Sequence, residues 1–177
     1  YRITGTGSCI TDITKTNSDF LKNKFLDLDG NSIQSSNAEI IEKFKSITGI
    51  VERRYAPNEI NSSDLAAEAA SIAIKDSKLD QETLDYIIVA HNTGDISCRS
   101  GQVDTLPSIA SKVKAKLKIK NSNCVAYDII CGCPGWVEGV IQAKSFIKSG
   151  MAKKCLVIGC DTLSRILDEN DRDSMIY

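Results

Sequence analysis

The sequence predicts a layered α/β fold with a mixed, mostly parallel sheet. Apolar runs at residues 86–90, 124–130 and 155–160 are continuous rather than alternating, as in strands that are covered on both faces. Stretches with helical periodicity lie between these runs. Strands that alternate with helices form parallel sheets through right-handed crossovers. The chain has 177 residues, enough for a domain with a sizeable core, and we expect one domain over residues 1–177.

Four helices are expected. They cover residues 37–47, residues 63–76, a segment that begins at Pro107, and residues 134–148. Ser63 is a suitable N-cap for the second helix, and Pro107 can open the third because the first helical position needs no N–H donor. The apolar stripes expected to face the core are Ile40, Ile41, Phe44 and Ile47 in the first helix, Leu65, Ala69, Ile72 and Ala73 in the second, and Ile109, Val113 and Leu117 in the third.

The remaining segments are expected to form a short strand and loops. Residues 2–8 are a strand candidate that ends in Gly5-Thr6-Gly7. A phosphate-binding loop would need a third glycine at the required spacing, so we interpret these glycines as turn residues. Residues 28–36 are polar and contain Asp29-Gly30-Asn31, which indicates a surface loop. A polar loop is also expected at residues 91–105.

Charge and hydropathy exclude several classes of function. The formal net charge is -1, which leaves no basic excess for nucleic acid. No apolar run approaches the roughly 18 residues that a membrane-spanning helix needs, so we expect no membrane partner. There is no signal peptide pattern, and Tyr1 indicates that the first residues of the protein are missing.

The seven cysteines indicate a reducing compartment. Their number is odd and their spacing forms no framework, so we expect free thiols and a cytoplasmic protein. Cys155 and Cys160 enclose an apolar run and are expected to be buried. Cys131 and Cys133 lack a second cysteine pair at metal-ligand spacing, so no metal site is expected.

Two of the predicted strands are followed by residues that could do chemistry. His91 comes directly after residues 86–90, and Cys131-Gly132-Cys133 follows residues 124–130. Ligands of parallel sheets bind at the carboxyl ends of the strands. We therefore expect both groups at the functional edge of the sheet.

Cys133 has the sequence surroundings of a nucleophile. Gly132 allows a tight turn after the strand, and Pro134 suits the first helical position. Cys133 would then lie at a helix N-terminus, where free N–H groups and the helix dipole stabilise a thiolate and can help to hold an oxyanion. The thiolate is the attacking form of cysteine. A buried structural cysteine beside a turn fits the local pattern equally well.

Residues 126–136, Ala-Tyr-Asp-Ile-Ile-Cys-Gly-Cys-Pro-Gly-Trp, resemble the nucleophile turn of beta-ketoacyl-acyl-carrier-protein synthase III. That family has Ala-Phe-Asp, four small or apolar residues and then Cys-Ala-Gly-Phe, which places Cys133 rather than Cys131 on the nucleophile position. Other similar stretches follow in the family's order: Gly5-Thr6-Gly7-Ser8, Thr48-Gly49-Ile50 with Arg53, Pro107-Ser108 with Ala110, Lys148-Ser149-Gly150, and Asp171-Arg172.

The resemblance implies a thiolase-like fold, in which a subunit has two similarly folded halves and two subunits form a homodimer. Residues 1–177 would be the N-terminal half, which carries the nucleophilic cysteine. The C-terminal half, with the family's catalytic His and Asn, would be absent from this chain. The resemblance implies no cofactor, because thioesters of coenzyme A or of acyl carrier protein are the substrates. Acyl carrier protein is the expected partner.

The resemblance also implies substrate-binding roles for Arg172, Lys43, Leu106 and Leu163. Arg172 takes the position of an Arg that stacks on the adenine of coenzyme A. Lys43 stands where the family has the opposing Trp, and Ile47 stands where it has a second Arg. This chain therefore differs from the family in the residues that contact the nucleotide of coenzyme A. Leu106 aligns with a residue that reaches across the dimer to the neighbour's acyl pocket.

The implied activity is acyl transfer in fatty acid or related biosynthesis. Cys133 would take an acyl group from a thioester, and the carbanion from decarboxylation of malonyl-acyl carrier protein would attack acyl-Cys133 to give a 3-ketoacyl thioester. A non-condensing acyltransferase and a hydroxymethylglutaryl-coenzyme A synthase-like enzyme of the same fold stay open as alternatives. A silent partner that binds a carrier protein is a further alternative, which the retention of Cys133 disfavours.

Two other features allow more than one reading. His91 is the only histidine and could act as a base, but it aligns with a small or hydroxyl residue, which favours lining the cleft or bonding locally. A basic run could face an acidic carrier protein, although a solvated helix face is the favoured interpretation. The run consists of Lys112, Lys114, Lys116, Lys118 and Lys120.

Overall fold

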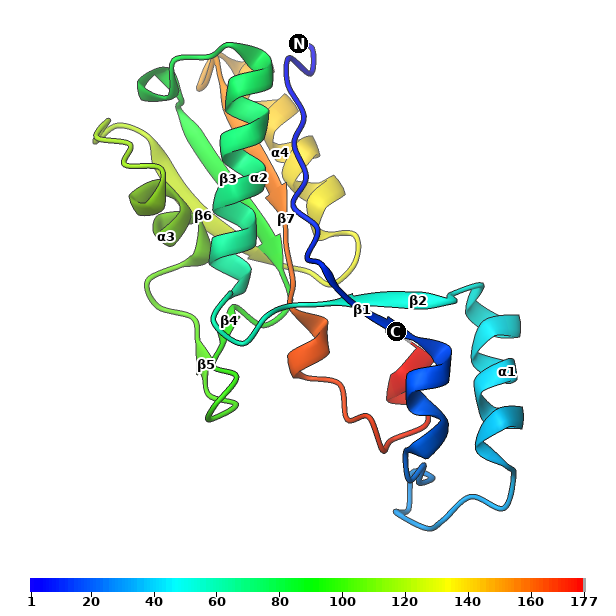
Figure 1. Cartoon of the computed structure of the whole chain (residues 1–177). Coiled ribbons are helices and arrows are strands. Elements are labelled where there is room, and N and C mark those ends of the chain that lie inside the picture. Colours follow the sequence, from blue (N-terminus) through cyan, green and yellow to red (C-terminus); the bar gives the residue numbers. More distant parts are fainter. Residues whose placement is uncertain (177) are drawn as a thin grey trace. The chain divides into compact units, whose positions relative to one another are not determined.

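The computed structural model describes residues 1–176, which form two compact units (Figure 1). The first unit comprises Tyr1–Ile10 and Asn58–Thr162. The second comprises Thr11–Pro57 and the segment that begins at Leu163. No helix within residues 1–176 is both long and apolar enough to cross a membrane.

A three-stranded parallel sheet forms the centre of the first unit. Its strand order is β6-β3-β7, with β3 at Tyr86–His91, β6 at Val125–Ile130 and β7 at Cys155–Gly159. All three strands lie where continuous apolar runs predict them, so the α/β prediction is confirmed. The register pairs His91 with Ile130, and Ala90 with Gly159. The carboxyl ends of the three strands therefore meet at one edge.

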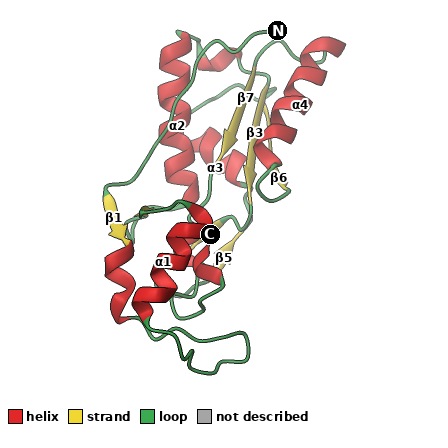
Figure 2. Ribbon diagram, turned by 90° about the vertical axis from the view of Figure 1, so that its right-hand side faces the viewer, coloured by secondary structure: helices red, strands yellow, loops and turns green. Residues whose placement is uncertain are grey.

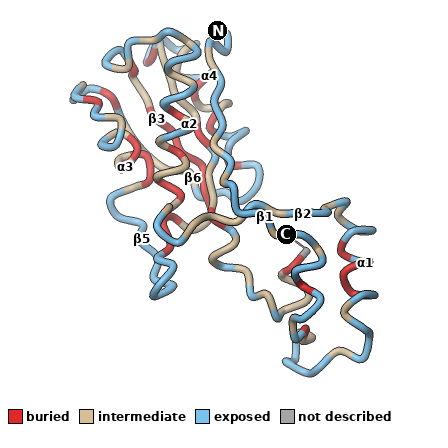
Figure 3. The backbone as a smooth tube through the Cα atoms, viewed as in Figure 1, coloured by how far each residue is buried: buried red, intermediate tan, exposed pale blue. Residues whose placement is uncertain are grey.

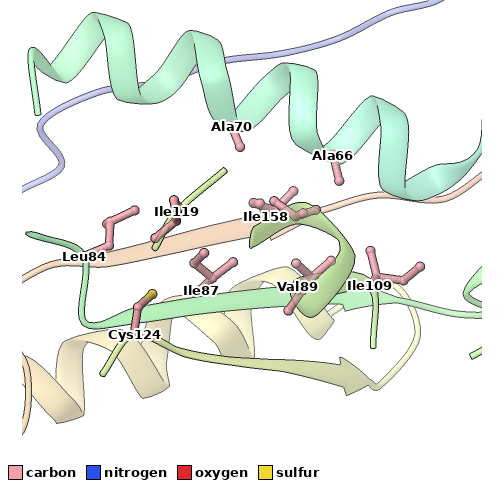
Figure 4. Packing of buried hydrophobic residues seen from close by; sticks show 11 residues of the cluster. Ala66, Ala70, Leu84, Ile87, Val89, Ile109, Ile119, Cys124 and Ile158 are labelled. Carbon is pink, nitrogen blue, oxygen red and sulfur yellow. The ribbon is translucent and has the colours of Figure 1, made fainter. Parts of the chain in front are cut away.

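Helices cover both faces of this sheet (Figure 2). The helices α2 (Ser62–Ser77) and α3 (Ile109–Lys116) pack together on one face, and α4 (Gly135–Ser149) packs on the other. Because side chains alternate along a strand, β3 is buried towards both layers. Figure 4 shows the α2 and α3 side of the core, which contains Ala66, Ala70, Leu84, Ile87, Val89, Ile109, Ala110, Val113, Ile119, Cys124 and Ile158.

The predicted inner stripe and cap of α2 are wrong. Ala66 and Ala70 face the core, whereas Ile72 is exposed. An alanine-rich helix has small apolar residues on several sides, so its periodicity does not identify one face. The N-cap is Asn61, and Ser63 lies in the first turn, where its N–H and hydroxyl both donate to Asp95 at 2.8 Å.

The strand predicted at residues 2–8 is also absent, since residues 1–11 have no regular secondary structure. The first residues lie along α2 instead (Figure 1). A Cβ atom on Gly5 would collide with the carbonyl oxygen of Ala73, and one on Gly7 with that of Ala69. These glycines therefore serve close packing against a helix rather than a turn.

The predicted polar loop after β3 contains a small antiparallel pair, β4 (Asp95–Ile96) with β5 (Val103–Asp104). The helix α3 follows, with Ser108 as its N-cap. The Ser108 hydroxyl accepts from the Ser111 N–H at 3.1 Å. Pro107 thus precedes the cap and does not open the helix, since a hydroxyl that can accept from the first turn is available one residue later.

The second unit has its own small core (Figure 3). Its strands β1 (Ile13–Thr16) and β2 (Glu52–Tyr55) are antiparallel, and its helix α1 covers Asn37–Thr48 as predicted. Ile47 is 66% exposed, so the predicted α1 stripe ends at Phe44. Three 3₁₀ helices complete the unit at Asn17–Lys22, Leu163–Arg165 and Ser174–Ile176. The core residues are Phe20, Phe25, Ile40, Ile41, Phe44 and Met175.

We predict that Gly139→Val destabilises the protein by about 1–3 kcal/mol, because overpacking forces neighbours to shift. Gly139 lies on the buried face of α4, where an added Cβ would be 2.8 Å from Val157 Cγ1 and 3.5 Å from Ile88 Cγ2. Ser145→Val, on the exposed side of α4, adds the same β-branched residue and should cost well under about 1 kcal/mol. Urea unfolding measures both; equal losses would contradict the close packing of α4.

Candidate active site

Cys133 lies in the turn that joins β6 to α4, at the predicted functional edge. Gly132 has φ of +64°, a left-handed conformation that glycine adopts without strain. The N–H of Gly135 donates to the Gly132 carbonyl at 3.0 Å and closes the turn. The sequence Gly132-Cys133-Pro134 therefore does form the tight turn that it predicts between strand and helix.

The surroundings of Cys133 suit an anionic group. Cys133 is exposed and stands one residue before Pro134, which is the N-cap of α4 rather than its first residue. The N–H groups of Trp136 and Val137 belong to the first turn, where a helix offers them no internal partner. No side chain caps this turn within the described residues. The free N–H groups and the helix dipole both favour negative charge here.

The site is open on this part of the chain. A hollow of about 450 Å³ is lined by Asn58, Glu59, Asn61, Ser97, Cys98 and Arg99. A second of about 290 Å³ is lined by Asn61, Asp95, Ser97, Gln102 and Asp104. Cys133 lines neither of them, so an enclosed acyl pocket would need further protein around this turn.

Burial separates some of the other thiols from Cys133: Cys124 is buried, whereas Cys155 and Cys160, which were predicted to be buried, are only partly so. None of the seven cysteines, all of which lie within residues 1–176, forms a disulfide. Burial raises the pKa of Cys155 to about 11 and that of Cys160 to about 12, and it also raises the pKa of Cys124. Cys98 and Cys131 are exposed, as is Cys133. The exposed thiols are therefore the candidates for chemistry near neutral pH.

His91 bonds locally. It is 3% exposed, and its Nδ1 accepts from the Gly94 N–H at 3.0 Å. The proton must then be on Nε2, which donates to Asp128 Oδ2 at 2.9 Å. Because both ring nitrogens are engaged, His91 presents no free base to the functional edge.

Asp128 connects three elements beside the active-site turn. Besides His91, its carboxylate accepts from the Ile109 N–H at 2.7 Å and the Ala110 N–H at 2.8 Å, which lie at the start of α3. Burial favours the neutral acid, but the hydrogen bonds from these groups outweigh it and lower the pKa of Asp128. The ionised carboxylate thereby joins β6 to the end of β3 and to α3.

Much of the predicted basic run has partners within the first unit. Lys112 Nζ donates to Asp95 at 3.1 Å and Asp104 at 2.9 Å. Lys114 Nζ donates to the Cys124 carbonyl at 2.6 Å. Lys116 pairs with Asp64, also at 2.6 Å. The expected solvated face is therefore wrong for Lys112 and Lys114, which are partly buried, whereas Lys116 is exposed as expected. Because the ammonium groups of all three lysines have partners, the run offers no continuous free basic surface.

The predicted substrate residues divide between the units. Leu106 belongs to the first unit, as does Cys133, and Leu106 is 82% exposed. In the second unit, Lys43 is exposed on α1 and Leu163 begins a 3₁₀ helix. Arg172 also belongs to this unit, where its Nε and Nη2 donate to the carboxylate of Asp173 at 2.8 and 3.1 Å.

A second polar pair at the functional edge was not predicted. Asn92 follows β3 and bonds to Asp161, which follows β7. Each residue comes just after an apolar strand of the parallel sheet. That position in the sequence could have identified both as residues of the functional edge.

Comparisons with known proteins agree with this turn and fold. A family model for 3-Oxoacyl-[acyl-carrier-protein (ACP)] synthase III matches residues 127–177, which include the Cys133 turn. Beta-ketoacyl-[acyl-carrier-protein] synthase III from Neisseria gonorrhoeae is 38% identical over 175 residues, 99% of this chain. A homologous protein from Vibrio vulnificus is 37% identical over the same length. Over 99% of its length the chain is thus similar to about half of a 3-oxoacyl-[acyl-carrier-protein] synthase III protein.

Solved structures of synthase III proteins agree with the thiolase-like fold. The structure from Aquifex aeolicus superposes with a TM-score of 0.77 at 33% identity and covers 99% of this chain. The structure from Thermus thermophilus also gives 0.77, at 31% identity. This chain covers 49% and 47% of those two structures. It spans 48% of the two curated synthase III relatives, about half their length.

We predict that iodoacetamide alkylates Cys133 fastest of the seven thiols at pH 7. A pKa of about 11 leaves roughly one thiolate in ten thousand for Cys155 at this pH, and Cys160 has fewer. The alkylation rates of Cys155 and Cys160 should rise about tenfold per pH unit until the pH reaches their pKa values. Peptide mass spectrometry resolves the sites. Cys98 is the control, since it is exposed but far in sequence from a helix start; if it outpaces Cys133, the helix-terminus argument fails.

Proposed function

We propose that this chain is the nucleophile-bearing part of a condensing acyltransferase of fatty acid or related biosynthesis. One observation carries the proposal: an exposed cysteine lies in the β6–α4 turn, at the start of a helix, in a chain that is 38% identical to synthase III. The reaction is the decarboxylative condensation of an acyl thioester with malonyl-acyl carrier protein. Its product is a 3-ketoacyl thioester.

Cys133 performs the first half of the reaction. Its thiolate attacks the carbonyl carbon of the donor thioester, and the carbonyl oxygen becomes an oxyanion. The free N–H groups at the start of α4 are suited to stabilise this charge. The C–S bond of the donor then breaks, so that the donor leaves as a thiolate and the acyl group stays on Cys133.

The second half of the reaction needs groups beyond this chain. Malonyl-acyl carrier protein loses carbon dioxide, and the electron pair of the broken C–C bond forms a carbanion. This carbanion attacks the carbonyl of acyl-Cys133, the new C–C bond forms, and the Cys133 thiolate leaves. We propose that the family's His and Asn stabilise the enolate from a C-terminal half.

The proposed domain organisation makes residues 1–177 the N-terminal thiolase-like half. The helix α4 supports this, because its apolar residues Trp136, Val137 and Ile141 are 47%, 51% and 48% exposed. A large apolar patch on a protein surface is commonly covered by other protein. A homodimer is also proposed, and the exposed Leu106 is available to meet a partner subunit. We propose a cytoplasmic location, which the lack of a disulfide among the seven cysteines of residues 1–176 favours.

We predict that incubation of the full-length protein with an acyl thioester places the acyl mass on Cys133 alone. Cys133→Ala should abolish labelling, whereas Cys131→Ala, two residues away in the same turn, should keep most of it. Mass spectrometry of tryptic peptides reads the site directly. Label on Cys131, or on neither residue, overturns the proposed function. The 177-residue piece alone should show thiol reactivity but no condensation.

The surroundings of Arg172 disfavour free coenzyme A as the donor. The hydrogen bond to Asp173, together with the charges of Asp173, Asp27 and Asp171, raises the pKa of Arg172. These carboxylates outnumber the single guanidinium and repel a polyanionic nucleotide. Asp173 also occupies N–H donors that a phosphate would need. We therefore propose that coenzyme A binds weakly here.

Asp173→Asn in the full-length protein should tighten coenzyme A binding about three- to tenfold, because it removes a charge that holds the Arg172 guanidinium. Lys43→Trp with Ile47→Arg should tighten it further by supplying a stacking ring and a second guanidinium on exposed positions of α1. Calorimetry measures each affinity. Asp29→Asn removes an exposed charge from the same unit and is the matched control. An equal gain in that control would show a general charge effect and remove the role of Asp173.

A further inference from the structure

Asn92 and Asp161 form a two-point clamp at the functional edge. The backbone N–H of Asn92 donates to Asp161 Oδ1 at 2.9 Å, and its side-chain Nδ2 donates to Asp161 Oδ2 at 2.6 Å. Both oxygens of one carboxylate are thus bonded by one residue. Bonds to an ionised acceptor are short and strong, which fits the 2.6 Å separation. The clamp joins the end of the central strand β3 to the end of β7.

This clamp fixes the direction of the Asn92 amide. An ionised carboxylate only accepts hydrogen bonds, so the NH₂ of Asn92 must face Asp161 and the amide oxygen must face away. That oxygen lies towards the active-site turn: a Cβ atom on Gly132 would be 3.9 Å from Asn92 Oδ1. Gly132 immediately precedes Cys133. An oriented, uncharged acceptor is therefore held beside the turn that carries the nucleophile.

We propose that Asn92 is a positioning residue for Cys133, and that Asp161 holds Asn92 in its working orientation. The inference rests on Cys133 being the nucleophile, as proposed above. An amide at position 92 lies near the turn without adding negative charge, whereas a carboxylate there would disfavour the thiolate. The negative charge of Asp161 lies on the NH₂ side of the Asn92 amide, away from its oxygen, where two N–H groups of Asn92 donate to it.

The test is the pH–rate profile of Cys133 alkylation in the full-length protein. Asn92→Asp puts a carboxylate next to the turn, and we expect the profile to move up by about one pH unit, which makes alkylation at pH 7 roughly tenfold slower. Iodoacetamide is the reagent, peptide masses resolve the sites, and thermal unfolding records the fold of each variant. The exposed thiol Cys98 should keep the parent's profile in every variant.

The exchange variant Asn92→Asp with Asp161→Asn separates positioning from a merely structural role. It again pairs an amide with a carboxylate, so the thermal midpoint should return towards that of the parent. The carboxylate now lies on the side of Cys133, so the profile should stay shifted. If the single variant Asn92→Asp unfolds, the exchange variant alone is compared with the parent protein. If the exchange restores the profile together with the midpoint, or if neither variant moves the profile, the proposal is overturned.

The measurement also distinguishes this proposal from the proposed function. Alkylation reports the thiol of Cys133 and requires no acyl donor. The pH–rate profile could shift in a protein whose Cys133 never takes acyl label. That result would support the positioning role of Asn92 and reject acyl transfer. Acyl label on Cys133 with an unmoved profile would retain acyl transfer and reject the role of Asn92.

Discussion

The hydrogen bonds of one carboxylate hold the edge of the sheet together. Asp128 receives one bond from His91 at the end of β3 and two from the first turn of α3. Removing a carboxylate from water is costly unless donors replace the lost hydration. The three donors must therefore stay in place together. Asp128 lies five residues before Cys133, so these bonds fix the strand that leads into the Cys133 turn.

The sequence could predict the parts of the fold that depend on local pattern. The run at residues 86–90 is apolar throughout because β3 has a helix layer on each face, and it became the central strand. The turn at Cys133 could be predicted for a similar reason. Gly132 supplies a left-handed conformation and Pro134 can begin a helix, so a few neighbouring residues determine the geometry.

Contacts between distant segments could not be predicted from pattern alone. Residues 2–8 were a strand candidate, yet they pack on α2, where two glycines let the backbone approach. The side of α2 that faces the sheet could not be predicted either, because this helix has alanines on several sides. Asn92 and Asp161 are 69 residues apart, and no periodicity links them. Their pairing follows only from the strand order β6-β3-β7, which single-strand patterns do not specify.

The position of β6 in this sheet has a dynamic consequence. Within the described residues, β6 is an edge strand, hydrogen-bonded to β3 on one side only. Edge strands open locally at a lower free energy than central ones, because fewer bonds must break and fewer buried contacts are lost. The chain thus reaches the Cys133 turn along an edge strand rather than along the central one. We therefore expect the slowest-exchanging amide protons in the central strand β3.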